Sequence, residues 1–207
     1  MTQNQNQQKA QLIIAIVAWA ALLLQLYLQI TNRTTDVAEA IIRYFSYFTI
    51  LTNLLVAVCF SSLMFPQSKN YRFFNLASVI TAITVYILIV GLVYNLVLRS
   101  LWKPQGLQLL VDNLLHSVTP LLSLLYWFFF ASVKNIYWQQ TFKWILYPLL
   151  YLVFVIIRGT LSNFYPYFFI DVSKLGYAKA FINSGYITLA FLLVSFLLLW
   201  LGKKKNV

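Results

Sequence analysis

One histidine, His116, lies in an apolar stretch of this chain, and another apolar stretch carries hydroxyl residues. A histidine within hydrogen-bonding distance of a hydroxyl is the minimum for acyl transfer, because the imidazole can remove the hydroxyl proton. The candidate hydroxyls are those of Thr49, Thr52, Ser117 and Ser46. Thr49 is favoured because it lies roughly 10 Å, and His116 roughly 13 Å, below the same expected membrane boundary at 1.5 Å per residue.

Polar residues one helical turn from this pair are candidates for supporting roles. Asp112 lies one turn before His116 and is expected to hold the imidazole in one tautomer or to stabilise its protonated form. Asn53 lies one turn after Thr49 and is expected to donate to a developing oxyanion. Pro120 has no amide hydrogen for the carbonyl of His116, so a kink is expected at the histidine.

Further polar residues are expected to converge on one pocket in the outer half of the membrane. Polar groups are costly inside hydrocarbon, so they are functional candidates by default. The expected pocket residues are Ser46, Asn95, Arg158, Asn163, Tyr165, Tyr167 and Asp171. The other interpretation is structural, because such groups also bond to their own helix or bridge two helices.

The elements that must position these residues are membrane-spanning helices. The 207 residues are 61% hydrophobic and only 9% charged, whereas a soluble domain has about 25% charged residues. The apolar runs reach the roughly 20 residues that a helix needs to cross a bilayer. We expect an all-α integral membrane protein with a single transmembrane domain, a six-helix bundle over residues 1–207. The expected helices lie near residues 11–30, 42–65, 73–98, 107–131, 141–160 and 180–201.

An even number of helices places both termini on one side, and the basic run 203–205 favours the cytoplasmic side. The net charge of +11 is interpreted as cations at the membrane surface that attract anionic lipids, not as a nucleic-acid surface. The only cysteine is Cys59, so a disulfide framework and a CxxC site are excluded. A single histidine excludes a histidine-cluster metal centre. No cofactor is expected, and the expected partners are membrane lipids, including a lipid ester substrate.

Three short segments follow one another along the chain in a recognisable order. They are Tyr47-Phe48-Thr49, then His116-Ser117-Val118-Thr119-Pro120, then Asn163-Phe164-Tyr165-Pro166-Tyr167 with Asp171 and Gly176 after it. Together they resemble the androgen-induced family of multi-pass membrane hydrolases, and more closely its bacterial six-helix relatives. The resemblance implies a threonine hydrolase of fatty acid esters of hydroxy fatty acids in a bacterial inner membrane, with Thr49 as nucleophile and His116 as base.

The chain departs from the family pattern at two places. The animal members tend to have Asn-His-x-x-His where this chain has residues 112–116, so the first of those histidines is missing and Asn113 stands beside Asp112 as a supporting candidate. Thr52, followed by Asn53, also fits the threonine segment and stays an alternative nucleophile. The alternative function is a non-catalytic lipid-binding or transport protein with a polar pocket inside the membrane.

Overall fold

Helices account for the fold, and residues 4–205, which the computed structural model describes, contain no strand. This follows from the solvent, because in hydrocarbon an open chain must satisfy its backbone groups within helices. Five helical segments are long and apolar enough to cross a membrane: Gln5–Thr31, Ala77–Leu98, Gly106–Phe130, Gln140–Ser162 and Val172–Lys205. A sixth span results if the bent pair Val37–Tyr44 and Phe48–Ser62 is one crossing. The expected all-α membrane architecture is confirmed at this level.

Helix α5 (Ala77–Val93) is the centre of the packing. It contacts α3 (Phe48–Ser62), α7 (Thr119–Phe130) and α10 (Val172–Lys205), and most of its residues are buried. Helix α1 (Gln5–Thr31) packs along α3 and α7 on the other side. Because α5 touches helices from both halves of the chain, polar groups from distant segments meet beside it.

The second expected helix, residues 42–65, is broken rather than continuous. Helix α2 (Val37–Tyr44) meets α3 at an angle of 72°. Tyr47 has an extended backbone, with φ −82° and ψ 129°, and is the N-cap of α3. The break frees the carbonyl of Ser46, which accepts a hydrogen bond of 2.9 Å from the Tyr151 hydroxyl. Ser46 therefore lies at the break, outside both helices, and not within the continuous helix expected over residues 42–65.

The remaining elements refine the expected boundaries. Helix α10 begins at Val172 rather than near residue 180 and bends at Gly176, where φ is 73°. The third expected helix is preceded by a separate short helix rather than beginning at Phe73. The further elements are α4 (Lys69–Phe74), the π-helical turn η1 (Tyr94–Leu98), α6 (Gly106–Asn113), the π-helical turn η2 (Leu114–Val118), α8 (Gln140–Trp144), α9 (Leu146–Ser162) and the 3₁₀ turn η3 (Phe168–Ile170).

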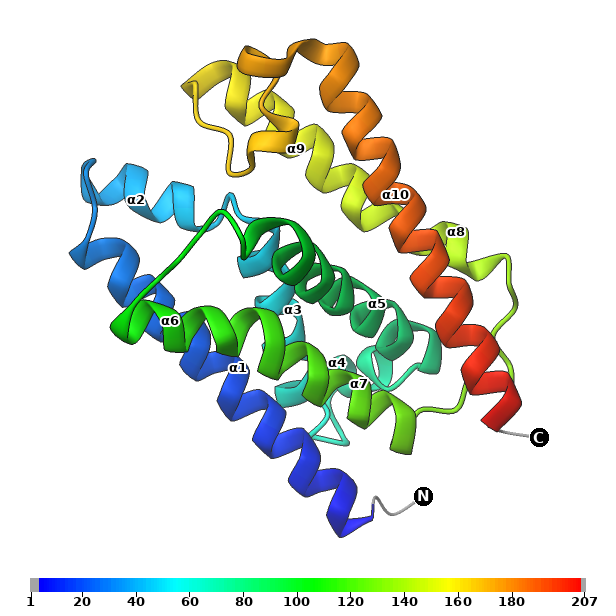
Figure 1. The fold of residues 1–207 in the computed structure, drawn as a ribbon. Helices are drawn as coiled ribbons and strands as arrows, with labels where there is room; N and C mark the ends of the chain where they lie inside the picture. The colour runs from blue at the N-terminus through cyan, green and yellow to red at the C-terminus, as the bar shows by residue number, and fades with distance from the viewer. Residues whose placement is uncertain (1–3, 206–207) are drawn as a thin grey trace.

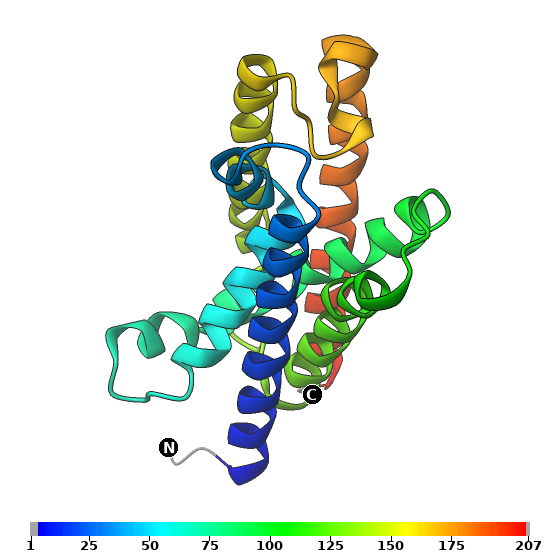
Figure 2. The same ribbon diagram turned by 90° about the vertical axis from the view of Figure 1, so that its left-hand side faces the viewer.

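The two ends of the described chain lie at the same end of the molecule. The first turn of α1 and the last turn of α10 are both in the lower part of the two views (Figures 1 and 2). At the opposite end, α9, the loop after it and the beginning of α10 extend beyond α2. The loop between α9 and α10 therefore lies on the side of the molecule where α2 and α3 meet.

Gly91→Ala is expected to destabilise the fold, because α5 approaches the carbonyl of His116 closely at this glycine. A β-carbon on Gly91 would lie 2.9 Å from that oxygen and 3.2 Å from the ring of Pro120. Overpacking of this kind costs about 1–3 kcal/mol, so the melting temperature in detergent should fall. The control is Gly185→Ala on α10, where a β-carbon meets nothing within 4 Å. Equal melting temperatures for the two variants would contradict the close approach.

Candidate active site

Thr49 and His116 lie side by side although 67 residues separate them in the chain. The Thr49 Oγ1 and His116 Nε2 atoms are 3.4 Å apart. The other ring nitrogen, Nδ1, is 2.9 Å from the backbone carbonyl oxygen of Asp112. A carbonyl only accepts, so in the neutral ring Nδ1 carries the hydrogen and Nε2 is left as an acceptor. The unprotonated nitrogen therefore faces the threonine hydroxyl, which is the arrangement that a general base requires.

The carboxylate of Asp112 binds three other side chains around the site, while its backbone oxygen binds the ring nitrogen. It accepts hydrogen bonds from the hydroxyl of Tyr94 at 3.1 Å, the indole of Trp102 at 2.7 Å and the amide of Gln108 at 2.9 Å. The ring of Tyr94 in turn stacks on the imidazole of His116, with centroids 3.8 Å apart and planes 12° apart. Thus the backbone carbonyl of Asp112 orients the imidazole, while its side chain holds the aromatic ring that covers it.

Pro120 explains the irregular backbone at the histidine. Proline offers no amide hydrogen to the carbonyls of His116 or Leu115, four and five residues before it. The turn η2, which contains both carbonyls, is π-helical, a form frequent at functional sites. Asn95 donates to the His116 carbonyl at 3.2 Å, and Asn53 donates to the Leu115 carbonyl at 3.3 Å. The expected kink is a π-helical turn whose free carbonyls are bound by two asparagines.

Asn53 is consequently not placed to stabilise an oxyanion. Its second amide hydrogen bond goes to the backbone carbonyl of Thr49, with a donor–acceptor distance of 2.9 Å. Both hydrogens of the amide are therefore directed at backbone oxygens. The amide oxygen of Asn53 is buried and, within residues 4–205, has no hydrogen-bond partner. The role that the geometry gives Asn53 is to fix the backbone next to Thr49 and next to His116, the candidate reacting pair.

Tyr167, and not Asn53, supplies a hydrogen-bond donor beside the Thr49 hydroxyl. The Thr49 amide lies in the first turn of α3, where backbone N–H groups have no partner in the helix, and it donates to the Tyr167 hydroxyl at 3.3 Å. The same hydroxyl is 3.4 Å from Thr49 Oγ1. Since its oxygen accepts from the amide, its own hydrogen can point at a group bound beside Thr49. Burial raises the pKa of Tyr167 to about 12, so the phenol keeps that hydrogen at neutral pH.

The alternative nucleophile, Thr52, has a different partner from Thr49. Its side chain is fully buried, and its hydroxyl is 3.2 Å from the hydroxyl of Tyr147. Thr49 is only partly buried and borders a cavity. The structure therefore pairs the imidazole with Thr49 and gives Thr52 a contact between α3 and α9.

The remaining candidates in the break after α2, in η2 and in α6 have local roles. Ser46 donates to the carbonyl of Ile42 on α2 at 2.7 Å. Ser117 lies 3.5 Å from the amide nitrogen of Asn95. Asn113 is the last residue of α6 and is half-buried. These residues lie near the reacting pair along the chain, but the contacts described for them belong to the helix framework.

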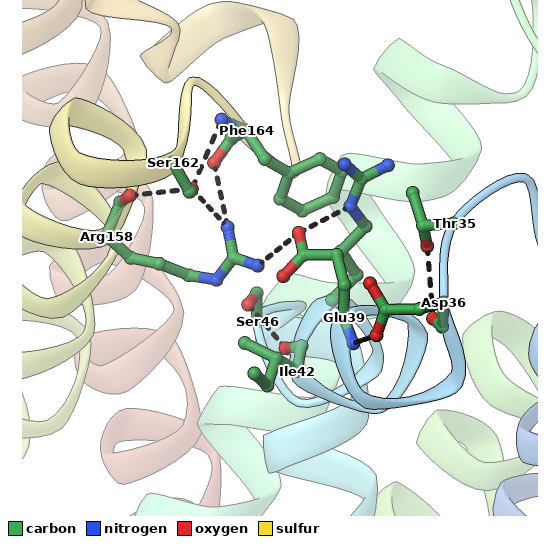
Figure 3. A network of polar contacts seen from close by, with 9 residues as sticks. Thr35, Asp36, Glu39, Ile42, Ser46, Arg158, Ser162 and Phe164 are labelled. Atoms are coloured by element: carbon green, nitrogen blue, oxygen red, sulfur yellow. Dashed lines mark hydrogen bonds and ion pairs between the residues drawn. The ribbon is translucent and has the colours of Figure 1, made fainter.

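Arg158 connects two helices instead of lining the expected pocket. It donates to Glu39 on α2 at 2.9 Å and to Ser162 on its own helix at 2.6 Å (Figure 3). Arg43 shares the same carboxylate, with Nε 2.7 Å from the Glu39 oxygen. The ring of Phe164 lies within cation–π distance of both guanidinium groups, at 4.6 Å from Arg43 and 4.9 Å from Arg158. This network fastens α9 and its following loop to α2.

Asn163, Tyr165 and Asp171 shape the loop between α9 and α10. Asn163 ends α9 in a left-handed conformation, with φ 56°. The ring of Tyr165 lies directly on Gly159, which leaves no space there for a β-carbon. Asp171 accepts from the amide of Ser173 at 3.1 Å, at the start of α10. These residues fix the loop that carries the phenol beside the reacting pair.

A cavity of about 550 Å³ opens beside the reacting pair. Thr49, His116 and Tyr167 are on its wall, and it extends to Arg33 and Arg43. Arg33 is exposed, so the cavity reaches the surface of the molecule. No group of three or more His, Cys, Asp or Glu side chains in residues 4–205 is arranged to hold a metal ion. The arrangement supplies a hydroxyl, an acceptor nitrogen and a phenol at the wall of this space, the polar cavity, which charged and amide side chains line together with apolar ones.

No protein-family model, no curated protein and no solved structure matches this chain.

Two residues of this region were missed by reasoning from the sequence. Tyr94 covers the imidazole, and its position next to the polar residue Asn95 in an apolar run was the available signal. Glu39 joins α2 to α9, and it is one of only four acidic residues in the chain. A rare carboxylate beside a membrane span implies a cationic partner, and Arg158 was the matching candidate.

Asp112→Asn is expected to lower the reactivity of the Thr49 hydroxyl by less than about tenfold. The backbone carbonyl that bonds to Nδ1 is unchanged by this substitution. In hydrolases where a carboxylate itself bonds to the histidine, the same exchange costs about 10⁴-fold. The rate of covalent labelling of Thr49 by a fluorophosphonate measures this effect, with Thr49→Ala as the blank. A loss as large as that of His116→Ala would mean that the carboxylate acts on the imidazole directly.

Proposed function

We propose that this protein is an intramembrane hydrolase of lipid esters, with Thr49 as nucleophile and His116 as general base. The observation that carries the proposal is the pairing of Thr49 Oγ1 with the unprotonated His116 Nε2 at 3.4 Å. This separation is long for a hydrogen bond, but such contacts commonly tighten only when substrate is bound. Fatty acid esters of hydroxy fatty acids are the proposed substrate class, on the resemblance to the androgen-induced family.

The first half of the reaction is acyl transfer to Thr49. Its oxygen attacks the ester carbonyl carbon as His116 Nε2 takes the hydroxyl proton. The carbonyl oxygen becomes an oxyanion, and the Tyr167 hydroxyl, 3.4 Å from Thr49 Oγ1, can donate to it. The first turn of α3, which carries Thr49, adds the positive end of a helix dipole. The C–O bond to the alcohol then breaks, and His116 returns the proton to the departing oxygen.

The second half of the reaction regenerates the threonine. Water enters through the polar cavity and attacks the acyl carbon while His116 accepts its proton. The bond to the Thr49 oxygen breaks, the proton returns to that oxygen, and a free fatty acid leaves. A site that borders both a polar cavity and hydrocarbon suits this sequence, because the substrate comes from the lipid and the second reactant is water.

The proposed placement in the membrane has six spans with both termini in the cytoplasm of a bacterial cell. It counts the bent pair of α2 and α3 as one crossing. The common location of the two ends of the described chain supports it (Figure 2). The basic residues 203–205 at the end of α10 favour the cytoplasmic side. In this orientation the polar cavity faces the outer side of the inner membrane.

A second candidate function is non-catalytic lipid binding or transport. The observation that favours it is the cavity itself, since a space of about 550 Å³ can hold an amphiphile without any reaction. The two functions differ in the reactivity of Thr49. A binding protein needs no activated hydroxyl, whereas a hydrolase does.

The hydrolase proposal predicts that a fluorophosphonate labels Thr49 in the purified protein. His116→Ala should reduce labelling by about 10²–10⁴-fold, because a general base contributes that much to such reactions. Mass spectrometry of the labelled peptide identifies the residue. Thr84→Ala is the matched control, since Thr84 is a buried helical threonine that donates only to its own helix, to Ile80.

Each outcome of the labelling experiment has a defined meaning. Labelling of Thr49 that depends on His116 supports the hydrolase. Labelling of Thr52 instead would keep the enzyme but reassign its nucleophile. A folded protein that reacts at neither threonine, and that hydrolyses no lipid ester, would favour the lipid-binding function.

The proposed topology predicts the accessibility of single cysteines introduced into a Cys59→Ser background. Lys103→Cys lies between the third and fourth spans and should react with an impermeant maleimide in intact spheroplasts. Lys204→Cys, at the end of α10, should react only after the membrane is opened. The reverse pattern would invert the orientation, and reaction of both in intact cells would exclude six spans with the termini inside.

A further inference from the structure

A second, smaller cavity lies behind Thr49, between α5, α9 and α10. Its volume is about 90 Å³. Thr49, Tyr94 and Tyr167 are on the walls of both cavities, so the two spaces meet at the candidate nucleophile. His116 is on the wall of the polar cavity alone. The hydroxyl of Thr49 is thus at the junction of a polar space and an apolar one.

The walls of the smaller cavity are suited to hydrocarbon. They include Ile89 and Val93 on α5, and Ile187 and Phe191 on α10. The hydroxyl of Thr188, also on the wall, donates to the carbonyl of Ser184 in its own helix at 2.9 Å. The hydroxyl of Ser184 likewise donates to the backbone carbonyl of Ala180. A ligand that enters this cavity beyond Thr49 and Tyr167 finds no free donor on these two hydroxyls, so the cavity favours an apolar group.

The position of His116 decides which part of an ester lies in which cavity. The alcohol oxygen takes its proton from Nε2 when the ester C–O bond breaks, so the alcohol must lie on the histidine side. That side is the polar cavity. The acyl group is on the opposite side of the carbonyl carbon and therefore extends into the smaller cavity.

We propose that the cavity between α5, α9 and α10 is an acyl-chain site, which holds the hydrocarbon tail of a lipid whose carbonyl lies at Thr49. The assignment of the acyl half rests on the proposed function. Leu149 is on the cavity wall and is 45% exposed, so the cavity reaches the outer face of α9. A long chain can therefore continue from the cavity into the surrounding bilayer, and the site binds the carbons nearest the carbonyl most closely.

The direct test is photocrosslinking of the full-length protein in lipid nanodiscs. The probe is a medium-chain fatty acid with a diazirine near the middle of the chain, and mass spectrometry maps the attachment sites. We expect attachment to the cavity walls on α5 and α10, and competition by unlabelled fatty acid. Attachment confined to outward residues such as Leu193, which is 61% exposed on α10, would overturn the proposal.

A matched pair of variants tests the same cavity by a second route. Ile187→Trp fills it and should reduce crosslinking by about tenfold, which corresponds to roughly 1.4 kcal/mol. Leu193→Trp places the same ring on the lipid-facing side of the same helix and should change nothing. Equal crosslinking in the two variants would contradict the site. The mapping on the unmodified protein stands whether or not Ile187→Trp folds.

Hydrolysis of an ester series separates this inference from the proposed function. With an active enzyme, Ile187→Trp should slow cleavage of octanoyl esters more than of acetyl esters, because an octanoyl chain needs far more of the cavity than an acetyl methyl group does. Crosslinks in the cavity without hydrolysis of any ester would support the acyl-chain site and contradict the proposed hydrolase function. Hydrolysis with crosslinks only on the lipid-facing surface would support the hydrolase function and contradict the acyl-chain site.

Discussion

Every backbone polar group at a helix break inside the bilayer needs a partner from the protein, because hydrocarbon offers none. This constraint shapes the centre of the molecule. The break between α2 and α3 exposes the amide of Thr49 and the carbonyl of Ser46, which Tyr167 and Tyr151 bind. The proline in α7 leaves the carbonyl of His116 to the amide of Asn95. Side chains from distant segments are thus drawn to the same place.

The reactive geometry follows from the same irregularities. A continuous second helix would have bonded the Thr49 amide to a carbonyl four residues earlier, and it would not have placed a helix N-terminus beside the hydroxyl. The π-helical turn places the imidazole of His116 over the carbonyl of Asp112, which selects its tautomer. Gly91 completes the arrangement, because the absence of a β-carbon lets α5 approach the irregular turn. The candidate chemistry therefore depends on backbone that departs from the ideal helix.

The sequence was informative about composition and periodicity and less so about tertiary partners. Apolar run lengths predicted the membrane helices, and equal depths along two of them predicted that Thr49 and His116 meet. The break before α3 contains no proline or glycine, so no signal in the sequence predicted it. Tyr94 and Glu39 owe their roles to side-chain partners on other elements, which no spacing rule within one helix reveals. Arg158 and Asp171 were singled out as polar, but their bonds shape the framework, since burial of a charge requires a partner whatever its function.

The dependence of α2 on α9 has a consequence for biogenesis. Synthesis runs from the N-terminus, so the segments that carry Thr49 and His116 are both made before α9 and α10 emerge. Until then Glu39 lacks Arg158, and the Thr49 amide lacks the Tyr167 hydroxyl. The smaller cavity also lacks the part of its wall that α10 forms until α10 has been synthesised. The segment from α9 to α10, which is synthesised last, thus completes the candidate site, and a nascent chain that stalls earlier leaves Thr49 and His116 without the Tyr167 hydroxyl.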